Sequence, residues 1–191
     1  MDPIAMCEQT LGGAERMVAS LRPDELSKPT PCTEWNVRQL VAHMTGVNWA
    51  FAGAAGGQRP EGGAAGHGAG AAASDEDVAG AYAASARAAL AAWRAPGTLE
   101  RTLTLPFGQM PGAQAIGFNI GDQLVHTWDL AKATGRDRTL DPETSEAVLE
   151  RVRQFLGPEA RGPGRPFGPE MPCAETAPIH DRLAAFLGRA V

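Results

Sequence analysis

Apolar residues recur at steps of three and four in four stretches of the chain, which is the spacing of helices that bury one face. Local signals mark their ends: Thr33 and Ser74 are predicted N-caps, and Gly135 is a predicted C-cap. The stretches cover residues 4–21, about 34–55, 74–96, and 111 or 112 to about 134. This pattern predicts an all-α fold built on four helices.

The segments between these helices lack the helical spacing. Prolines predict a loop over residues 22–32, and Gly and Ala so dominate residues 53–73 that we expect a mobile loop there, with His67 in solvent. Leu103 and Leu105 alternate with threonines, which predicts a short extended connection or irregular hairpin ahead of the fourth helix.

Two shorter amphipathic stretches follow Gly135. One begins at Asp141 and Pro142, a usual helix start, and the other lies within residues 177–189. We therefore expect a single domain over residues 1–191. Within it, residues 1–135 would form the four-helix bundle and residues 136–191 a two-helix C-terminal appendage.

Composition narrows the classes of function. The 191 residues carry a net charge of −5 without any cluster of Lys and Arg, so nucleic acid is not an expected partner. The chain has no run of about 18 apolar residues, so we expect no membrane span, and its N-terminus does not resemble a secretory signal. Its three widely spaced cysteines predict neither disulfides nor a thiolate zinc site. We expect a cytoplasmic protein.

The fourth predicted helix carries ionisable side chains among apolar ones, and buried ionisable groups need a partner or a metal. Asp122 and His126 are four residues apart, so they share one face of the helix. His43 borders the apolar stripe of the second helix. Two histidines and a carboxylate are a usual ligand set for catalytic zinc or nickel with an open position. The spacing leaves open an alternative, a hydrogen-bonded Asp122–His126 pair with a structural role.

Several neighbours of this group have expected roles. We expect Trp128 in the core and Gln123 at the wall of a pocket. Asp129 would form a cap or a salt bridge to an arginine, or accept a hydrogen bond from a ligand histidine. Cys32 precedes the second helix, but nothing in the sequence pairs it with a base, so we expect no catalytic role for it. We expect His180 on the surface of the last helix.

Three phrases of the sequence resemble those of a known family: KPTPCTEWNVRQLVAHMTG, GDQLVHTWDLAKATGR and FGPEMPCAETAPIHDRLAAFLGR. Nearly the whole chain resembles an actinobacterial family related to the N-terminal domain of mycothiol-dependent maleylpyruvate isomerase, in the DinB/YfiT-like superfamily of metal-dependent bundles. The resemblance implies a DinB-like four-helix bundle and metal ligation by His43, Asp122 and His126. The acid of the family pattern looks like glutamate. Asp122 is one methylene shorter, which leaves direct and water-mediated coordination open.

The resemblance also implies a function. We expect a zinc- or nickel-dependent enzyme that uses a thiol such as mycothiol as co-substrate, in transfer to or isomerisation of an electrophilic small molecule. Homodimers are common among such bundles, as the resemblance implies. Two other functions stay open: a small-molecule binding protein with or without metal, and a hydrolase or lyase of specialised metabolism that uses the same site.

Overall fold

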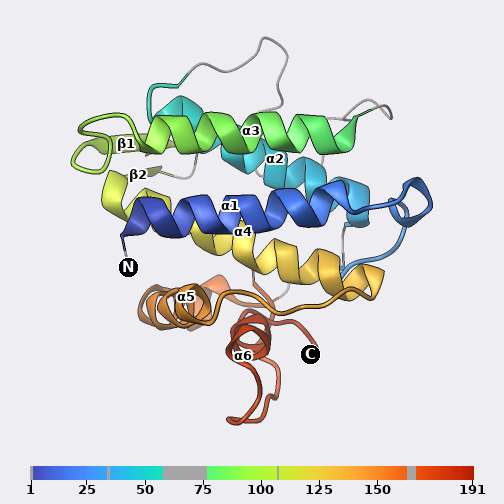
Figure 1. The fold of residues 1–191 in the computed structure, drawn as a ribbon. Coiled ribbons are helices and arrows are strands. Elements are labelled where there is room, and N and C mark those ends of the chain that lie inside the picture. The colour runs from blue at the N-terminus through green and yellow to red at the C-terminus, as the bar shows by residue number, and fades with distance from the viewer. Residues whose placement is uncertain (1, 34, 58–76, 107, 163–166) are drawn as a thin grey trace.

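The computed structural model describes residues 2–33, 35–57, 77–106, 108–162 and 167–191, and within them the chain is mostly helical (Figure 1). The helices are α1 (Pro3–Ala19), α2 (Val37–Ala54), α3 (Val78–Trp93), α4 (Gly112–Thr134), α5 (Pro142–Phe155) and α6 (Ile179–Phe186), with the 3-10 turns η1 (Pro23–Glu25) and η2 (Pro158–Ala160). Strands β1 (Thr102–Leu105) and β2 (Gly108–Pro111) form a small sheet before α4. The expected all-α fold is confirmed.

The first four helices form a four-helix bundle. α1 packs against α3 and α4, and α2 packs against the same two helices (Figure 1). Their apolar faces meet in one core, whose largest buried side chains include Trp93, Tyr82, Leu40, Met44 and Ile116. Because each such side chain contributes about 1.5–3 kcal/mol when it leaves water, these faces hold the bundle together.

The ends of the helices follow local signals, with one difference from the expectation. Gly135 takes a left-handed conformation (φ 70°) at the end of α4, as expected for a C-cap without a Cβ. At the start of α2 the N-cap is Asn36, and the expected cap Thr33 lies outside the helix. Asn36 accepts a hydrogen bond from the N–H of Gln39, and the Gln39 side chain accepts one from the N–H of Asn36. This reciprocal pair starts α2 at Val37, which is later than expected.

Two expectations fall partly outside the described residues. α3 begins at Val78 with Asp77 as its N-cap, whereas the expected cap Ser74 lies outside the described residues. The Gly/Ala-rich segment does not begin its loop at residue 53, because α2 continues to Ala54 and a turn follows. Residues 58–76, with His67 among them, are outside the described part of the chain.

The hairpin before α4 confirms the expected extended connection. β1 and β2 are antiparallel, with Thr102 opposite Pro111. Leu103 and Leu105 are buried, as their alternation predicts, and β1 contacts both α2 and α4. The hairpin thus covers the end of the bundle from which α4 begins.

The last two helices lie on the side of α4 away from α3 (Figure 1). α5 and α6 contact each other, and both contact α4. Trp128 joins α4 to α6, because its indole N–H donates to Asp181 Oδ1 at 2.8 Å. No helix within the described residues is both long and apolar enough to span a bilayer.

Candidate metal centre

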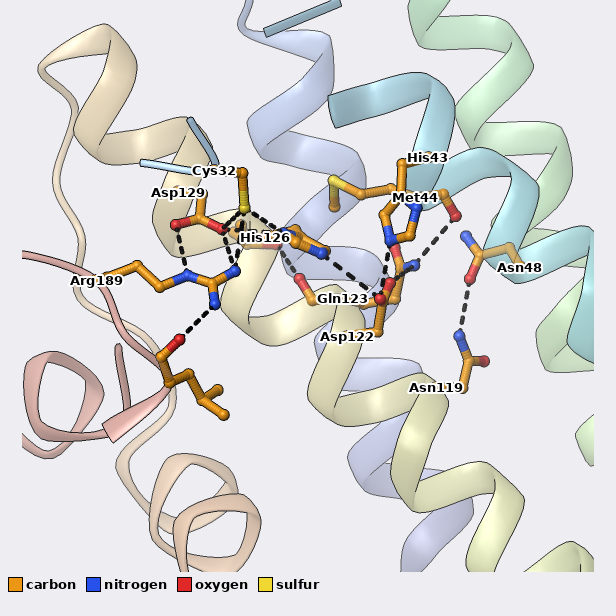
Figure 2. A network of polar contacts seen from close by, with 12 residues as sticks. Cys32, His43, Met44, Asn48, Asn119, Asp122, Gln123, His126, Asp129 and Arg189 are labelled. Atoms are coloured by element: carbon orange, nitrogen blue, oxygen red, sulfur yellow. Dashed lines mark hydrogen bonds and ion pairs between the residues drawn. The ribbon is translucent and has the colours of Figure 1, made fainter. Parts of the chain in front are cut away.

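Three side chains from two helices converge between α2 and α4. His43 lies on α2, whereas Asp122 and His126 lie one turn apart on α4 (Figure 2). His43 Nε2 is 3.1 Å from Asp122 Oδ1, and His126 Nε2 is 3.5 Å from the same oxygen. The structure therefore brings together the three residues that the sequence singled out as candidate metal ligands.

These distances fit the ligands of a single ion. In a tetrahedral zinc site, His nitrogen and carboxylate oxygen each lie about 2.0–2.2 Å from the metal, which places two ligand atoms about 3.4 Å from each other. Separations of 3.1 and 3.5 Å bracket that value, and the three atoms lie within 4.8 Å of one another. Asp122 therefore reaches the point between the two imidazoles in spite of its shorter side chain. The donor set present fits a divalent cation.

The three side chains differ in exposure. The side chains of His43 and His126 are 6% and 9% exposed, whereas that of Asp122 is 22% exposed. Trp35, just before α2, lies against the imidazoles, with ring centroids 4.4 Å from His43 and 6.1 Å from His126. Asp122 thus forms the open edge of the group, and the Trp35 indole shields the imidazoles from water.

The second oxygen of Asp122 is held from inside the bundle. Gln123 Nε2 donates to Asp122 Oδ2 and to the Met44 carbonyl oxygen, each at 3.1 Å. Tyr82 Oη donates in turn to Gln123 Oε1 at 2.7 Å. Gln123 is fully buried inside the bundle, where its side chain is hydrogen-bonded to Asp122, to the Met44 carbonyl oxygen and to Tyr82.

The other ring nitrogen of His126 contacts Asp129, one turn further along α4. His126 Nδ1 lies 2.9 Å from Asp129 Oδ2. Burial alone would raise the pKa of Asp129, but the charges and hydrogen bonds of Arg189 and His126 lower this pKa to about 2. An ionised carboxylate only accepts hydrogen bonds, so Nδ1 of His126 carries the proton that it donates to Asp129, and Nε2 is the ring nitrogen that faces Asp122. Asp129 thus combines both roles considered from the sequence, the salt bridge and the acceptor.

Arg189 and Cys32, which are far apart in the sequence, both contact Asp129 (Figure 2). Arg189 donates through Nη2 to Asp129 Oδ2 at 3.0 Å and through Nε to Oδ1 at 3.3 Å. Cys32 Sγ lies 3.3 Å from Asp129 Oδ2 and 3.8 Å from His126 Nδ1. The structure therefore places two possible bases beside Cys32, although nothing in the sequence pairs it with one. Local sequence spacing could not reveal that Cys32 and Arg189 contact Asp129, because these residues come from distant segments of the chain.

The Cys32 thiol is protonated in this arrangement. Burial and the neighbouring Asp129 charge raise its pKa to about 12, against the opposing effect of Arg189. The thiol donates to Asp129 and accepts from Arg189 Nη2, which lies 3.1 Å from the sulfur. Cys32 is therefore part of the hydrogen-bond network and not a free nucleophile.

The remaining candidates lie away from the convergence point. Trp128 is fully buried, which confirms its place in the core, and it faces α6. His180 lies in the first turn of α6 and is partly exposed. A groove of about 360 Å³ runs between α1 and the segment after α4, where Arg16, Asp137 and Asp141 line it. This groove is separate from the His43–Asp122–His126 group.

Sequence and structure comparisons agree with the resemblance drawn from the motifs. The family model described as mycothiol maleylpyruvate isomerase N-terminal domain matches residues 8–131. Over 196 aligned residues the chain is 39% identical to two uncharacterized proteins of Mycobacterium tuberculosis, from strains CDC 1551 and H37Rv, and both alignments cover 100% of each chain. The expected resemblance is confirmed.

Solved structures have the same fold. A histidine-to-alanine mutant of mycothiol-dependent maleylpyruvate isomerase has a TM-score of 0.66 at 13% identity, over 85% of this chain and 73% of that chain. A second structure of mycothiol-dependent maleylpyruvate isomerase has a TM-score of 0.54 at 14% identity, over 68% of this chain and 59% of that chain. The family match spans Cys32 and all the acids and histidines of the group, but ends before Arg189.

Proposed function

Because the chain belongs to the mycothiol maleylpyruvate isomerase N-terminal domain family, we propose that it is a metal-dependent enzyme that joins a thiol to an electrophilic small molecule or isomerises that molecule. The metal is zinc or nickel, held by His43, Asp122 and His126, and the thiol is mycothiol. The observation that carries the proposal is the convergence of the two Nε2 atoms on Asp122 Oδ1, at 3.1 and 3.5 Å.

The chemistry of the donor set supports a divalent metal with positions left for substrate. Two imidazole nitrogens and one carboxylate oxygen leave a tetrahedral or larger coordination shell incomplete. A bound zinc or nickel ion supplies Lewis acidity that favours the thiolate form of a bound thiol and polarises a carbonyl group. The two solved relatives are named as mycothiol-dependent, which supports mycothiol as the thiol here.

The side chains around the group divide the remaining tasks. Asp129 keeps the proton on Nδ1 of His126, so that Nε2 faces the centre. Gln123 holds Asp122 Oδ2 and so directs Oδ1 at the two imidazoles. Trp35 excludes water from the imidazole face, and the partly exposed Asp122 marks the side from which thiol and substrate approach.

A metal-free binding protein is the rival function, and one observation favours it. His43 Nε2 and Asp122 Oδ1 lie at hydrogen-bond distance, 3.1 Å, so a protonated Nε2 can donate to the carboxylate without any ion. In that case the group stabilises the contact between α2 and α4, and substitution of His43 leaves metal content and ligand binding unchanged.

Elemental analysis separates the two functions. The full chain is purified without chelators and without a His-tag, as wild type and as His43→Ala, His126→Ala and His180→Ala. We expect near-stoichiometric zinc or nickel in the wild type and in His180→Ala, whose histidine lies on α6, and loss of the metal in the other two variants. A wild type that holds no metal after addition of either ion contradicts the metal-dependent function and leaves the binding protein.

Activity is tested on the metal-loaded protein. Mycothiol is mixed with an electrophile, beginning with maleylpyruvate because it is the substrate named for the solved relatives. Thiol consumption and isomer formation are both followed, since isomerisation regenerates the thiol. We expect turnover by the wild type and none by His43→Ala given the same metal. A loaded wild type that is inactive toward a panel of such electrophiles contradicts the thiol-dependent activity.

A further inference from the structure

A second set of metal-ligating atoms lies on the opposite side of the His126 ring. Cys32 Sγ, His126 Nδ1 and an Asp129 carboxylate oxygen lie within 4.8 Å of one another. The sulfur is 3.3 Å from Asp129 Oδ2, and Nδ1 is 2.9 Å from the same oxygen. Thiolate, imidazole and carboxylate are three ligand types that zinc and other soft divalent ions use. We call Cys32, His126 and Asp129 the thiol-side group.

A cation of the protein itself already lies in the thiol-side group. Arg189 Nη2 is 3.1 Å from Cys32 Sγ and 3.0 Å from Asp129 Oδ2. Its Nε is 3.3 Å from Asp129 Oδ1, and its Nη1 donates to the Leu187 carbonyl oxygen at 2.9 Å. Arg189 is only 9% exposed, so the guanidinium is fixed beside the sulfur and the carboxylate (Figure 2).

We propose that the Arg189 guanidinium is the built-in cation of the thiol-side group and prevents a soft divalent metal from binding to Cys32. A guanidinium keeps its positive charge at every physiological pH, and its fork of N–H donors matches a carboxylate in two places. Its charge repels a divalent ion from the sulfur, and its hydrogen bonds occupy the Asp129 oxygens that such an ion needs. Metal is thereby left to the Nε2 side of His126. Arg189 acts in this way as a positioning residue, because it acts through Asp129, which contacts His126.

The proposal assigns a role to the C-terminal segment. Arg189 lies beyond residue 131, where the family match ends. Lys132 Nζ donates to the Ala190 carbonyl oxygen and holds the same segment on α4. The C-terminal segment therefore supplies the positive charge that prevents metal binding on the Nδ1 side of His126 and leaves the Nε2 side available to a metal. Metal binding on the Nε2 side rests on the proposed function, whereas the exclusion of metal from the thiol-side group does not.

Cadmium titration of the full chain tests the proposal. Thiolate coordination to cadmium produces a charge-transfer band in the ultraviolet, and a coordinating thiol loses its proton to solvent on binding. The proteins are the wild type, Cys32→Ser, Arg189→Met and the double variant that combines Arg189→Met with Cys32→Ser. We expect no Cys32-dependent band in the wild type, a band in Arg189→Met, and its loss in the double variant. The proposal is overturned if the wild type shows a band that Cys32→Ser removes, or if folded Arg189→Met shows none.

Two further variants control for loss of structure. Arg161→Met removes a guanidinium that holds the same C-terminal segment, through the Phe186 carbonyl oxygen at 2.7 Å, without a contact to Cys32. It should give no band, and a band there would attribute the effect to loosening of the segment and overturn the proposal. Arg189→Gln retains N–H donors while it removes the charge. If Arg189→Met does not fold by circular dichroism, the presence or absence of a Cys32-dependent band in Arg189→Gln decides the proposal.

The outcome is independent of the proposed metal-dependent function. Cadmium binding to the thiol-side group in Arg189→Met needs neither His43 nor Asp122, so the band should persist when His43→Ala is added. If the wild type binds no metal but Arg189→Met gains the band, the proposed function fails and this inference stands. If the wild type binds metal through His43 and Arg189→Met gains no band, the inference fails and the proposed function stands.

Discussion

His126 Nδ1 lies 2.9 Å from Asp129 Oδ2, three residues further along α4, and this contact determines which ring nitrogen faces His43 and Asp122. The Asp129 carboxylate accepts a hydrogen bond from Nδ1, so Nε2 is the ring nitrogen directed at the centre. Arg189 donates to both oxygens of the same carboxylate. The orientation of one candidate ligand therefore depends on a residue near the C-terminus.

The substitution Asp129→Asn should weaken metal binding about 10- to 100-fold, because the partner of a ligand histidine sets the orientation and basicity of its ring. The amide also presents an N–H that can face Nδ1, which favours the wrong tautomer. Zinc affinity is measured by competition with a chromophoric chelator. Asp137→Asn, at an exposed position after α4, is the control and should bind like the wild type. Unchanged affinity in Asp129→Asn would show that His126 is positioned without its carboxylate.

The substitutions Asp122→Asn and Asp122→Glu test whether this acid coordinates directly. Asp122 Oδ1 lies 3.1 and 3.5 Å from the two Nε2 atoms, a separation compatible with direct ligation. Asp122→Asn removes the charge and should reduce zinc affinity by at least about tenfold. Asp122→Glu keeps the charge and should retain more affinity than Asp122→Asn, measured by the same competition. Equal affinity in wild type and Asp122→Asn contradicts coordination by this residue.

The substitution Trp128→Phe should destabilise the protein and leave the metal content unchanged. It removes the donor to Asp181 Oδ1 at 2.8 Å and leaves a mostly buried carboxylate without that bond. We expect a loss of about 1–3 kcal/mol in the free energy of unfolding, measured by denaturant titration. Trp49→Phe, at a partly buried position of α2, serves as the control for a change of ring size. Loss of metal from folded Trp128→Phe would show that Trp128 also supports the metal centre.

The stability of the protein should decrease in acid through Glu25. Its hydrogen bonds with Arg136, followed by that with the Arg22 N–H, lower the pKa of this carboxyl from 4.5 to about 2. A carboxyl whose pKa is lowered in the folded state stabilises that state above its unfolded pKa, and the effect disappears as pH falls through the folded pKa. The contribution of Glu25 to the free energy of unfolding should therefore be fully present above pH 4.5. It should decline as the pH falls from 4.5 to about 2.

The variant Glu25→Gln isolates this contribution. Denaturant titrations of both proteins between about pH 7 and about pH 3 give the difference in unfolding free energy at each pH. The difference should be largest near neutrality and shrink in acid, because below pH 4.5 the unfolded chain becomes protonated at Glu25 and the stability gained from the charge in the folded state is progressively lost. A difference that stays constant over this range would show that the charge of Glu25 does not stabilise the fold.

Much of the helical architecture could be predicted from the sequence, because helix period and caps act over a few residues. Gly135 ends α4 as expected, and the alternation of Leu103 and Leu105 predicts their burial. The start of α2 was predicted wrongly because Thr33 and Asn36 are both good caps. The sequence carried a signal for the right one, since Asn36 is followed three residues later by Gln39, which closes the reciprocal pair.

The sequence by itself determined the helices and the shared face of Asp122 and His126, because a helix places residues four apart on one side whatever surrounds it. Only the tertiary structure decided that Cys32 and Arg189, which are 157 positions apart, meet at Asp129. Such contacts depend on how whole helices and the C-terminal segment pack, and no local period encodes that packing. The physical reason is that helix formation is decided by neighbours along the chain, whereas the environment of a thiol or an imidazole is decided by neighbours in space.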